Sequence, residues 1–174
     1  ARADAFCMKI DASVLPNILP VAEKRLAAFA RPLFFFDLLP TGLTRLTPYG
    51  SASPATAPDL GGSPYSLLCA TGNPEHVRQT AMRLLGREPA DCFIMQDHHH
   101  YTETDALTAR RLGHPIVCTA KDAVKLVPLL PLFGDIPVWT LDARAVFSEA
   151  LFTDQPFASW WEKNLRRLRA LTFG

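Results

Sequence analysis

Residues 92–102 read CFIMQDHHHYT, an apolar run followed directly by a polar segment that holds three adjacent histidines. The run CFIMQ (92–96) has the length and apolar content of a buried strand. A helix is predicted after the polar segment, from about Glu103 to Leu112. The order strand, polar loop, helix recurs on both sides of this stretch, and the recurrence decides the fold class.

On the N-terminal side, YSLLCAT (65–71) predicts a strand, and the turn GNP leads into a helix over residues 75–85. On the C-terminal side, PIVCT (115–119) predicts a strand, and AKD leads into the short helix DAVKLV. PVWTLD (137–142) predicts a last strand. Strands that alternate with helices indicate an α/β fold with a mostly parallel sheet and flanking helices.

The N-terminal part of the chain predicts a smaller unit of the same kind. Strands over residues 4–10 and 33–38 flank a helix that is predicted to begin at Pro20, which makes a partial βαβ unit. Residues 48–64 are rich in Pro, Gly, Ser and Ala, and this composition is typical of a linker. We therefore expect three parts: residues 1–47, the linker 48–64, and a C-terminal α/β domain over residues 65–174.

Composition narrows the function. The 174 residues carry a formal net charge of +1, and this balance does not suggest a nucleic-acid-binding protein. Cys69, Cys92 and Cys118 lie in predicted strands, and Cys7 is also far from any other cysteine, so no CxxC metal signature exists. Buried, reduced thiols are the expected state of the strand cysteines.

Unusual polar residues follow each of the central strands. In a parallel sheet the loops that follow the strands share the carboxyl edge, where ligands bind and helix N-termini point. Lys121 is well placed there to hold a phosphate group as a point charge. The residues that we expect to share this edge are Gly72, Asn73, Asp97, His98, Lys121 and Asp122.

Each loop also has a purely structural interpretation. Asn73 followed by Pro74 is a common way to begin a helix, with Asn73 as the N-cap. Thr102 with Asp105 resembles a capping arrangement for the next helix. Lys121 and Asp122 could form an exposed pair that contributes little.

The histidines allow more than one role. Consecutive residues point in different directions, whereas side chains that share one metal ion normally come from spaced positions, so we expect no metal site here. A general-base or phosphate-contacting role for one histidine fits the loop position better. The other two histidines would then be exposed.

Four motifs, in order, resemble the C-terminal half of the tetraacyldisaccharide 4'-kinase family, the lipid A kinases of Gram-negative bacteria. They are ATGNP (70–74), DHHHY (97–101), TAKDAVKL (119–126) and WTLDAR (139–144). The start ARADAF and the stretch RPLFFFDLLPTGL also resemble that family. The departures are Thr71, Val77 and Ala120, where the family pattern has isoleucine, an aromatic residue and glutamate.

The resemblance implies a P-loop-kinase-like fold and an enzyme that transfers phosphate from ATP, with Mg²⁺, to the 4'-hydroxyl of a lipid A disaccharide precursor. His98 would help to deprotonate that hydroxyl, and Asp97 would orient the loop. Gly72, Asn73, Lys121 and Asp122 would serve nucleotide or phosphate binding. The resemblance also implies a cytoplasmic protein, peripheral to the inner membrane, that acts in lipopolysaccharide biosynthesis.

The sequence contains neither a GxxxxGK[ST] motif nor the family's DDGFQH segment. We therefore expect a C-terminal portion of the kinase that is inactive alone, with ATP and Mg²⁺ bound mainly by the absent half. Strands 4–10 and 33–38 would then have open edges, through which a dimer could form. Two alternatives stay open: a non-catalytic binding module derived from the kinase, and a manganese-dependent phosphoesterase of the DHH type, which a short Asp-His-His string also resembles.

Overall fold

A computed structural model of the chain describes residues 3–51, 60 and 62–173. The described residues divide into two compact units, one that lies within residues 1–38 and 145–174 and one that lies within residues 39–144. The strands form one sheet with the order β1-β2-β7-β6-β4-β5, and the short β3 (Gly50–Ser51) pairs with β2 off this path. This architecture confirms the predicted α/β class with a mostly parallel sheet.

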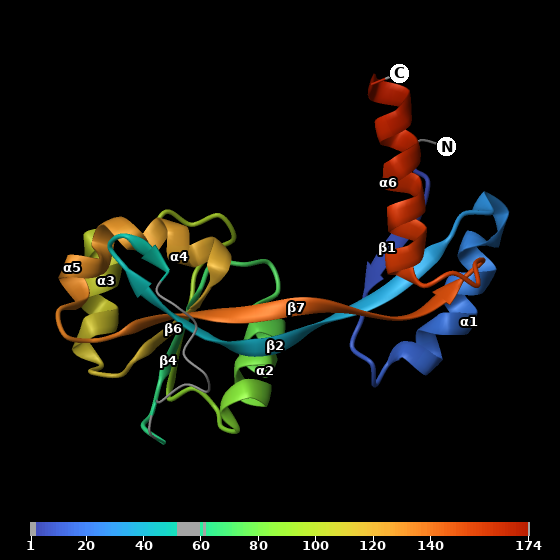
Figure 1. Ribbon diagram of the computed structural model, residues 1–174. Coiled ribbons are helices and arrows are strands. Elements are labelled where there is room, and N and C mark those ends of the chain that lie inside the picture. The colour runs from blue at the N-terminus through green and yellow to red at the C-terminus, as the bar shows by residue number, and fades with distance from the viewer. Residues whose placement is uncertain (1–2, 52–59, 61, 174) are drawn as a thin grey trace. The chain divides into compact units, whose positions relative to one another are not determined.

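The larger unit is built around the parallel strands β5, β4, β6 and the first part of β7 (Figure 1). Its strands are β4 (Ser66–Cys69), β5 (Asp91–Ile94), β6 (Ile116–Thr119) and β7 (Val138–Leu151). Its helices are α2 (Pro74–Leu85), α3 (Glu103–Arg111), α4 (Ala120–Leu126) and α5 (Leu130–Phe133), with a 3₁₀ turn, η2 (Val127–Leu129), before α5.

Alternate residues of β4 enter different cores, because successive side chains of a strand point to opposite faces. Leu68 packs with Ile116 and residues of α3, α4 and α5 on one face, and Leu67 packs with Val117 and α2 on the other. Both leucines are fully buried. Burial of each stabilises the fold by roughly 1.5–3 kcal/mol, so the two faces fix the orientation of the strand.

The smaller unit contains the predicted βαβ arrangement. It consists of β1 (Phe6–Lys9), α1 (Leu15–Leu26), a 3₁₀ turn, η1 (Ala27–Phe29), and the start of β2 (Leu33–Thr47). β1 pairs in parallel with β2. The helix begins earlier than the predicted Pro20, because Pro16 occupies its first turn, where a missing N–H costs nothing.

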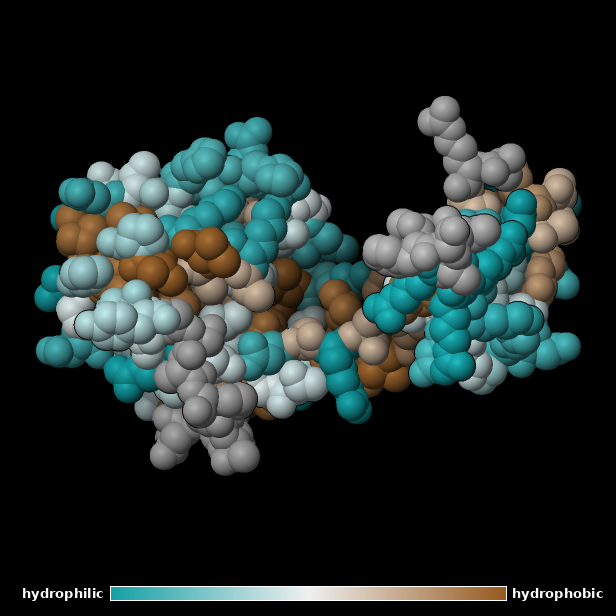
Figure 2. All heavy atoms as spheres, turned by 45° about the horizontal axis from the view of Figure 1, so that its top comes forward, coloured by the Kyte–Doolittle hydropathy of each residue, from teal (hydrophilic) through white to brown (hydrophobic). Residues whose placement is uncertain are grey.

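Helix α6 (Phe157–Phe173) also belongs to this unit. Phe157 and Trp160 pack on the sheet. The Phe157 ring stacks on Phe147 at 3.7 Å, and the Trp160 ring lies 5.4 Å from Phe34, both measured between ring centroids. Figure 2 shows hydrophilic residues along part of this helix. Lys163 is one of its exposed residues. No helix among the described residues is long and apolar enough to cross a lipid bilayer.

The compact units divide the chain at other places than the predicted boundaries at residues 47 and 65. The reason is the length of β2 and β7, which each contribute residues to both units. The predicted linker lies mostly at residues 52–59 and 61, outside the described residues. The predicted open edge of strand 33–38 is wrong, because β2 lies between β1 and β7.

The cysteine prediction holds in part. Cys69 and Cys118 are buried and free. Burial raises the pKa of the Cys69 thiol to about 11, so this thiol is protonated near neutral pH. Cys92 is exposed instead of buried, because its strand β5 lies at the end of the sheet and packs on one side only.

Candidate active site

The three predicted loops do meet at the carboxyl edge of the central sheet. Strands β4, β5 and β6 are parallel, in the pairing β5-β4-β6, so that their C-terminal ends lie together. A direct contact joins two of the loops, because the Lys121 Nζ atom donates a hydrogen bond of 2.6 Å to Asp97 Oδ1. These residues are 24 positions apart, so the fold brings them together.

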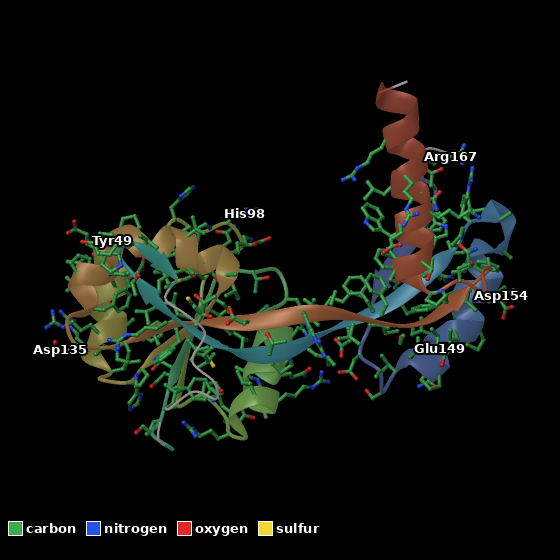
Figure 3. All side chains as sticks on the ribbon, viewed as in Figure 1. Tyr49, His98, Asp135, Glu149, Asp154 and Arg167 are labelled. Carbon is green, nitrogen blue, oxygen red and sulfur yellow. The ribbon has the colours of Figure 1, made fainter. Side chains whose placement is uncertain are left out.

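His98 lies on a tight turn just beyond the end of β5 (Figure 3). The His99 amide donates to the Gln96 carbonyl oxygen at 3.0 Å, which closes the turn. The φ angle of His98 is 64°, in the left-handed region that residues other than glycine rarely adopt. Such backbone strain occurs often at functional sites. The turn leaves the imidazole 82% exposed, at the rim of its unit.

Asp97 holds this turn in two ways. Its Oδ1 atom accepts the His98 backbone N–H at 3.0 Å, and the same oxygen accepts from Lys121. The hydrogen bond from Lys121 is the largest cause of a lowered Asp97 pKa, and His98 adds to the effect. Asp97 is therefore ionised near neutral pH and orients the loop as an acceptor.

Lys121 lies in the first turn of α4, at the positive end of the helix dipole. Its side chain is 43% exposed, and an ammonium group has three protons to donate. The bond to Asp97 uses one of them, which leaves donors for a phosphate oxygen. The alternative interpretation as an exposed Lys121–Asp122 pair is wrong, because Lys121 pairs with Asp97 and Asp122 is buried.

Asp122 points inward. Its side chain has no exposed area, and it accepts hydrogen bonds from the Ala70 amide and the Thr119 hydroxyl. The predicted role in nucleotide or phosphate binding has no support from this position, since the carboxylate does not face solvent. A charged residue at a helix start is normally exposed, so sequence reasoning alone missed the burial.

Gly72 and Asn73 adjoin the site through different contacts. A β-carbon added at Gly72 would lie 3.7 Å from Asp97 Oδ2, which places this glycine beside the Asp97 side chain. The Asn73 side chain accepts the His76 amide at 3.1 Å and caps α2, with Pro74 in the first turn. The structural interpretation of Asn73 is thus confirmed, and its side-chain oxygen is occupied by the cap.

His99 and His100 differ from each other. His99 Nε2 lies 3.0 Å from Asp105 Oδ2, in the confirmed capping box of α3, and its ring packs edge-on against Tyr101. The expected exposure of His99 is therefore wrong, whereas His100 is exposed. Lys125 was not predicted as a neighbour of the site, yet its Nζ donates to the His99 carbonyl oxygen at 2.8 Å.

The candidate site was not expected to hold a metal ion. Across residues 3–51, 60 and 62–173, no group of three or more His, Cys, Asp or Glu side chains is placed to hold a metal ion. The described side chains at the carboxyl edge thus offer an exposed imidazole, a lysine and an ordered carboxylate. Such a set suits proton transfer and the binding of anionic groups.

Comparisons with known proteins point to one family. Residues 10–157 match the family model described as tetraacyldisaccharide-1-P 4'-kinase. The chain is 37% identical over 166 residues to the tetraacyldisaccharide 4'-kinase of Nitratidesulfovibrio vulgaris, which covers 95% of this chain and 44% of that protein. It is 35% identical over 178 residues to the enzyme of the same name from Oleidesulfovibrio alaskensis. That match covers 98% of this chain and 48% of the relative.

The chain therefore spans about half the length of the curated relatives that it matches. Among solved structures, the "apo" form of LpxK from Aquifex aeolicus in complex with ATP matches with a TM-score of 0.46 and 17% identity. That match covers 83% of this chain and 37% of the other.

Proposed function

Because the chain belongs to the tetraacyldisaccharide-1-P 4'-kinase family, we propose that it forms the C-terminal portion of an ATP-dependent lipid A kinase. The complete enzyme transfers the γ-phosphate of ATP to the 4'-hydroxyl of a tetraacyldisaccharide 1-phosphate. The proposal depends above all on the Asp97–Lys121 contact. This contact joins the DHHHY and TAKDAVKL motifs at one edge of the sheet, beside the exposed His98.

His98 acts as the general base in this proposal. Histidine side chains as a class accept and release protons near neutral pH, which suits removal of a hydroxyl proton. The 82% exposure of His98 leaves its ring free to reach an acceptor hydroxyl. A carboxylate from the half of the enzyme that this chain lacks would orient the imidazole, and Asp97 keeps the turn in place.

Lys121 supplies positive charge to the transferred phosphate. Phosphoryl transfer depends mainly on the positioning of reactants and on charge stabilisation, so a lysine at the N-terminus of α4 fits this role. Gly72 lies beside the Asp97 side chain, at the edge where we place the phosphate groups. Mg²⁺ would be held mainly by residues outside this chain, and it would supply further positive charge to the phosphate groups of ATP.

The location follows from the acceptor. A tetraacyl disaccharide resides in a lipid bilayer, so the enzyme would act as a peripheral protein at the cytoplasmic face of the inner membrane. A dimer through the open edge of β1 (Phe6–Lys9) stays a prediction, which gel filtration tests directly. Family membership favours the kinase over the manganese phosphoesterase and leaves the non-catalytic module as the competing interpretation.

Product identity tests the proposal. A protein that joins this chain to the part of the Nitratidesulfovibrio vulgaris relative that this chain does not cover should convert tetraacyldisaccharide 1-phosphate and ATP into a bis-phosphorylated lipid, detected by mass spectrometry. The 174-residue chain alone should show no ATP turnover. Failure of the joined protein, when the intact relative is active in the same assay, would favour the binding module. Magnesium-dependent ATP hydrolysis by the pure chain would contradict the proposal that ATP and Mg²⁺ are bound mainly by residues outside it.

A further inference from the structure

Asp122 is a buried carboxylate that the proposed chemistry does not use. Its side chain has no exposed area, and its hydrogen-bond partners are neutral groups. An ionised carboxylate is costly to bury unless hydrogen bonds and local dipoles compensate for the loss of water. Its place in the first turn of α4 provides one such compensation, since the helix dipole is positive there.

The carboxylate connects the ends of two strands. Both of its oxygens lie 3.3 Å from the Ala70 amide nitrogen, at the end of β4. The Thr119 hydroxyl at the end of β6 donates to Oδ2 at 2.7 Å, and the Asp122 amide donates back to that hydroxyl at 3.2 Å. Ala70 and Asp122 are 52 residues apart, so this is a tertiary contact and not a local cap alone.

The third loop reaches the same carboxylate through Tyr101. Burial is the main cause of the raised pKa of the Tyr101 phenol, and the negative charge of Asp122 is the next. The Tyr101 ring is buried in the same core cluster as Ala70 and as Ala123, the chain neighbour of Asp122. No hydrogen bond of standard geometry joins its phenol oxygen to the described residues. Tyr101 ends the DHHHY motif, so Asp122 adjoins all three loops of the candidate site.

We propose that Asp122 is a positioning residue that holds the three loops of the carboxyl edge together and thereby sets Lys121 against Asp97. The position of each loop follows from contacts of the described residues, and only the chemistry that the loops perform rests on the proposed function. In this proposal Asp122 touches neither the nucleotide nor the acceptor. Its role is therefore structural, in place of the nucleotide or phosphate binding that the sequence predicted.

Substitution of Asp122 by asparagine removes its charge with little change in shape. The Asp97 pKa reports the consequence, since the bond from Lys121 is the main cause of its depression. Loss of a nearby negative charge would by itself lower the Asp97 pKa, because fewer anions would then oppose its ionisation. Loss of positioning would weaken the Lys121 contact and raise the same pKa. The sign of the shift therefore separates positioning from simple electrostatics.

The experiment is an NMR titration of the Asp97 carboxyl carbon in the complete 174-residue chain. We expect Asp122→Asn to raise the Asp97 pKa by about half a unit or more. Thr119→Val, which keeps the Asp122 charge but removes the hydroxyl donor, should raise it by less. Amide hydrogen exchange at Ala70 should accelerate about tenfold in Asp122→Asn, since its acceptor is weakened.

Thr80→Val is the control for Thr119→Val, because Thr80 is buried but its hydroxyl donates to the His76 carbonyl oxygen within α2. It should change neither the Asp97 titration nor the exchange of the Ala70 amide. An unchanged or lowered Asp97 pKa in both loop variants would overturn the proposal. If Asp122→Asn does not fold, Thr119→Val decides the question alone. Kinase activity does not enter this test, so failure of the proposed function would leave its outcome intact.

Discussion

Two histidine–aspartate contacts lie at opposite edges of the same parallel strands. At the carboxyl edge, His98 Nε2 is 3.7 Å from Asp97 Oδ2 and its side chain is 82% exposed. At the amino edge, His114 Nδ1 is 3.2 Å from Asp91 Oδ2, and its side chain is 31% exposed. The same pair of residue types thus occurs in two very different settings.

The amino-edge contact is fixed by strand register. Ser66 and Asp91 are paired residues at the starts of β4 and β5, and the Ser66 hydroxyl lies 3.5 Å from both Asp91 Oδ2 and His114 Nδ1. His98, by contrast, lies beyond the end of its strand on a strained turn. The difference teaches that a His–Asp contact does not by itself mark a site. Its position relative to strand ends and helix N-termini does.

Lys121→Ala should produce the largest difference in catalytic effect between the two edges. It removes the positive charge that we propose to stabilise the transferred phosphate. A hydrogen bond to a charged group is worth about 1.5–3 kcal/mol. We expect kcat/KM of the joined enzyme to fall roughly 10–100-fold. Ser66→Ala at the amino edge should leave steady-state kinetics unchanged. Equal losses in both variants would show that the edges do not differ in function.

Stability should respond in the opposite way. His114→Ala removes a half-buried contact with Asp91 and should lower the free energy of unfolding by about 1 kcal/mol, measured by urea denaturation. His98→Ala should change it by less than about 0.5 kcal/mol, because the side chain is mostly exposed. A larger loss for His98→Ala would mean that the turn has a structural role that its contacts do not show.

His98→Gly tests whether the backbone at position 98 is strained. Glycine adopts positive φ without strain, which favours the folded state, whereas its freedom in the unfolded chain opposes this gain. The net effect should be a gain of a few tenths of a kcal/mol in the free energy of unfolding. The matched change His114→Gly should destabilise the protein. A loss at position 98 would show that the left-handed turn carries no strain.

Acid should remove one contribution to stability at the carboxyl edge. The pKa of Asp97 is lowered in the folded state, mainly by Lys121. The resulting stabilisation is present above the ordinary aspartate pKa of about 4 and is lost as pH falls through the lower folded value. Lys121→Met should abolish this part of the acid dependence, which urea denaturation between about pH 5 and pH 2 would reveal. A pH profile identical to the wild type would contradict the assigned cause.

Much of the larger unit could be predicted because local and global signals agree there. Apolar runs of strand length, an Asn–Pro helix start and the Thr102–Asp105 capping box placed β4, β5 and β6 and the helices that follow them. The parallel order then gathered Asp97, His98 and Lys121 at one edge. The sequence therefore predicted a shared edge for these residues, whereas the hydrogen bond between Lys121 and Asp97 came from the structure.

The features that the sequence did not predict depend on contacts between distant residues, which no local sequence pattern encodes. β2 continues past Pro40 to Thr47, and β7 continues through the polar Arg144 and Glu149, because these long strands lie side by side in the sheet. The burial of Asp122 depends on the Ala70 amide, 52 residues away. The His114–Asp91 contact depends on strand register in the same way.

The rate of phosphate transfer in the joined enzyme, with His98→Ala at saturating ATP and acceptor, tests the central claim most directly. The exposed neighbour His100 and the amino-edge His114 provide matched controls. We predict a loss of about 10²–10⁴-fold for His98→Ala with ATP binding largely kept, the range expected for a general base, and near wild-type rates for His100→Ala and His114→Ala. Transfer at the wild-type rate by His98→Ala would contradict the account.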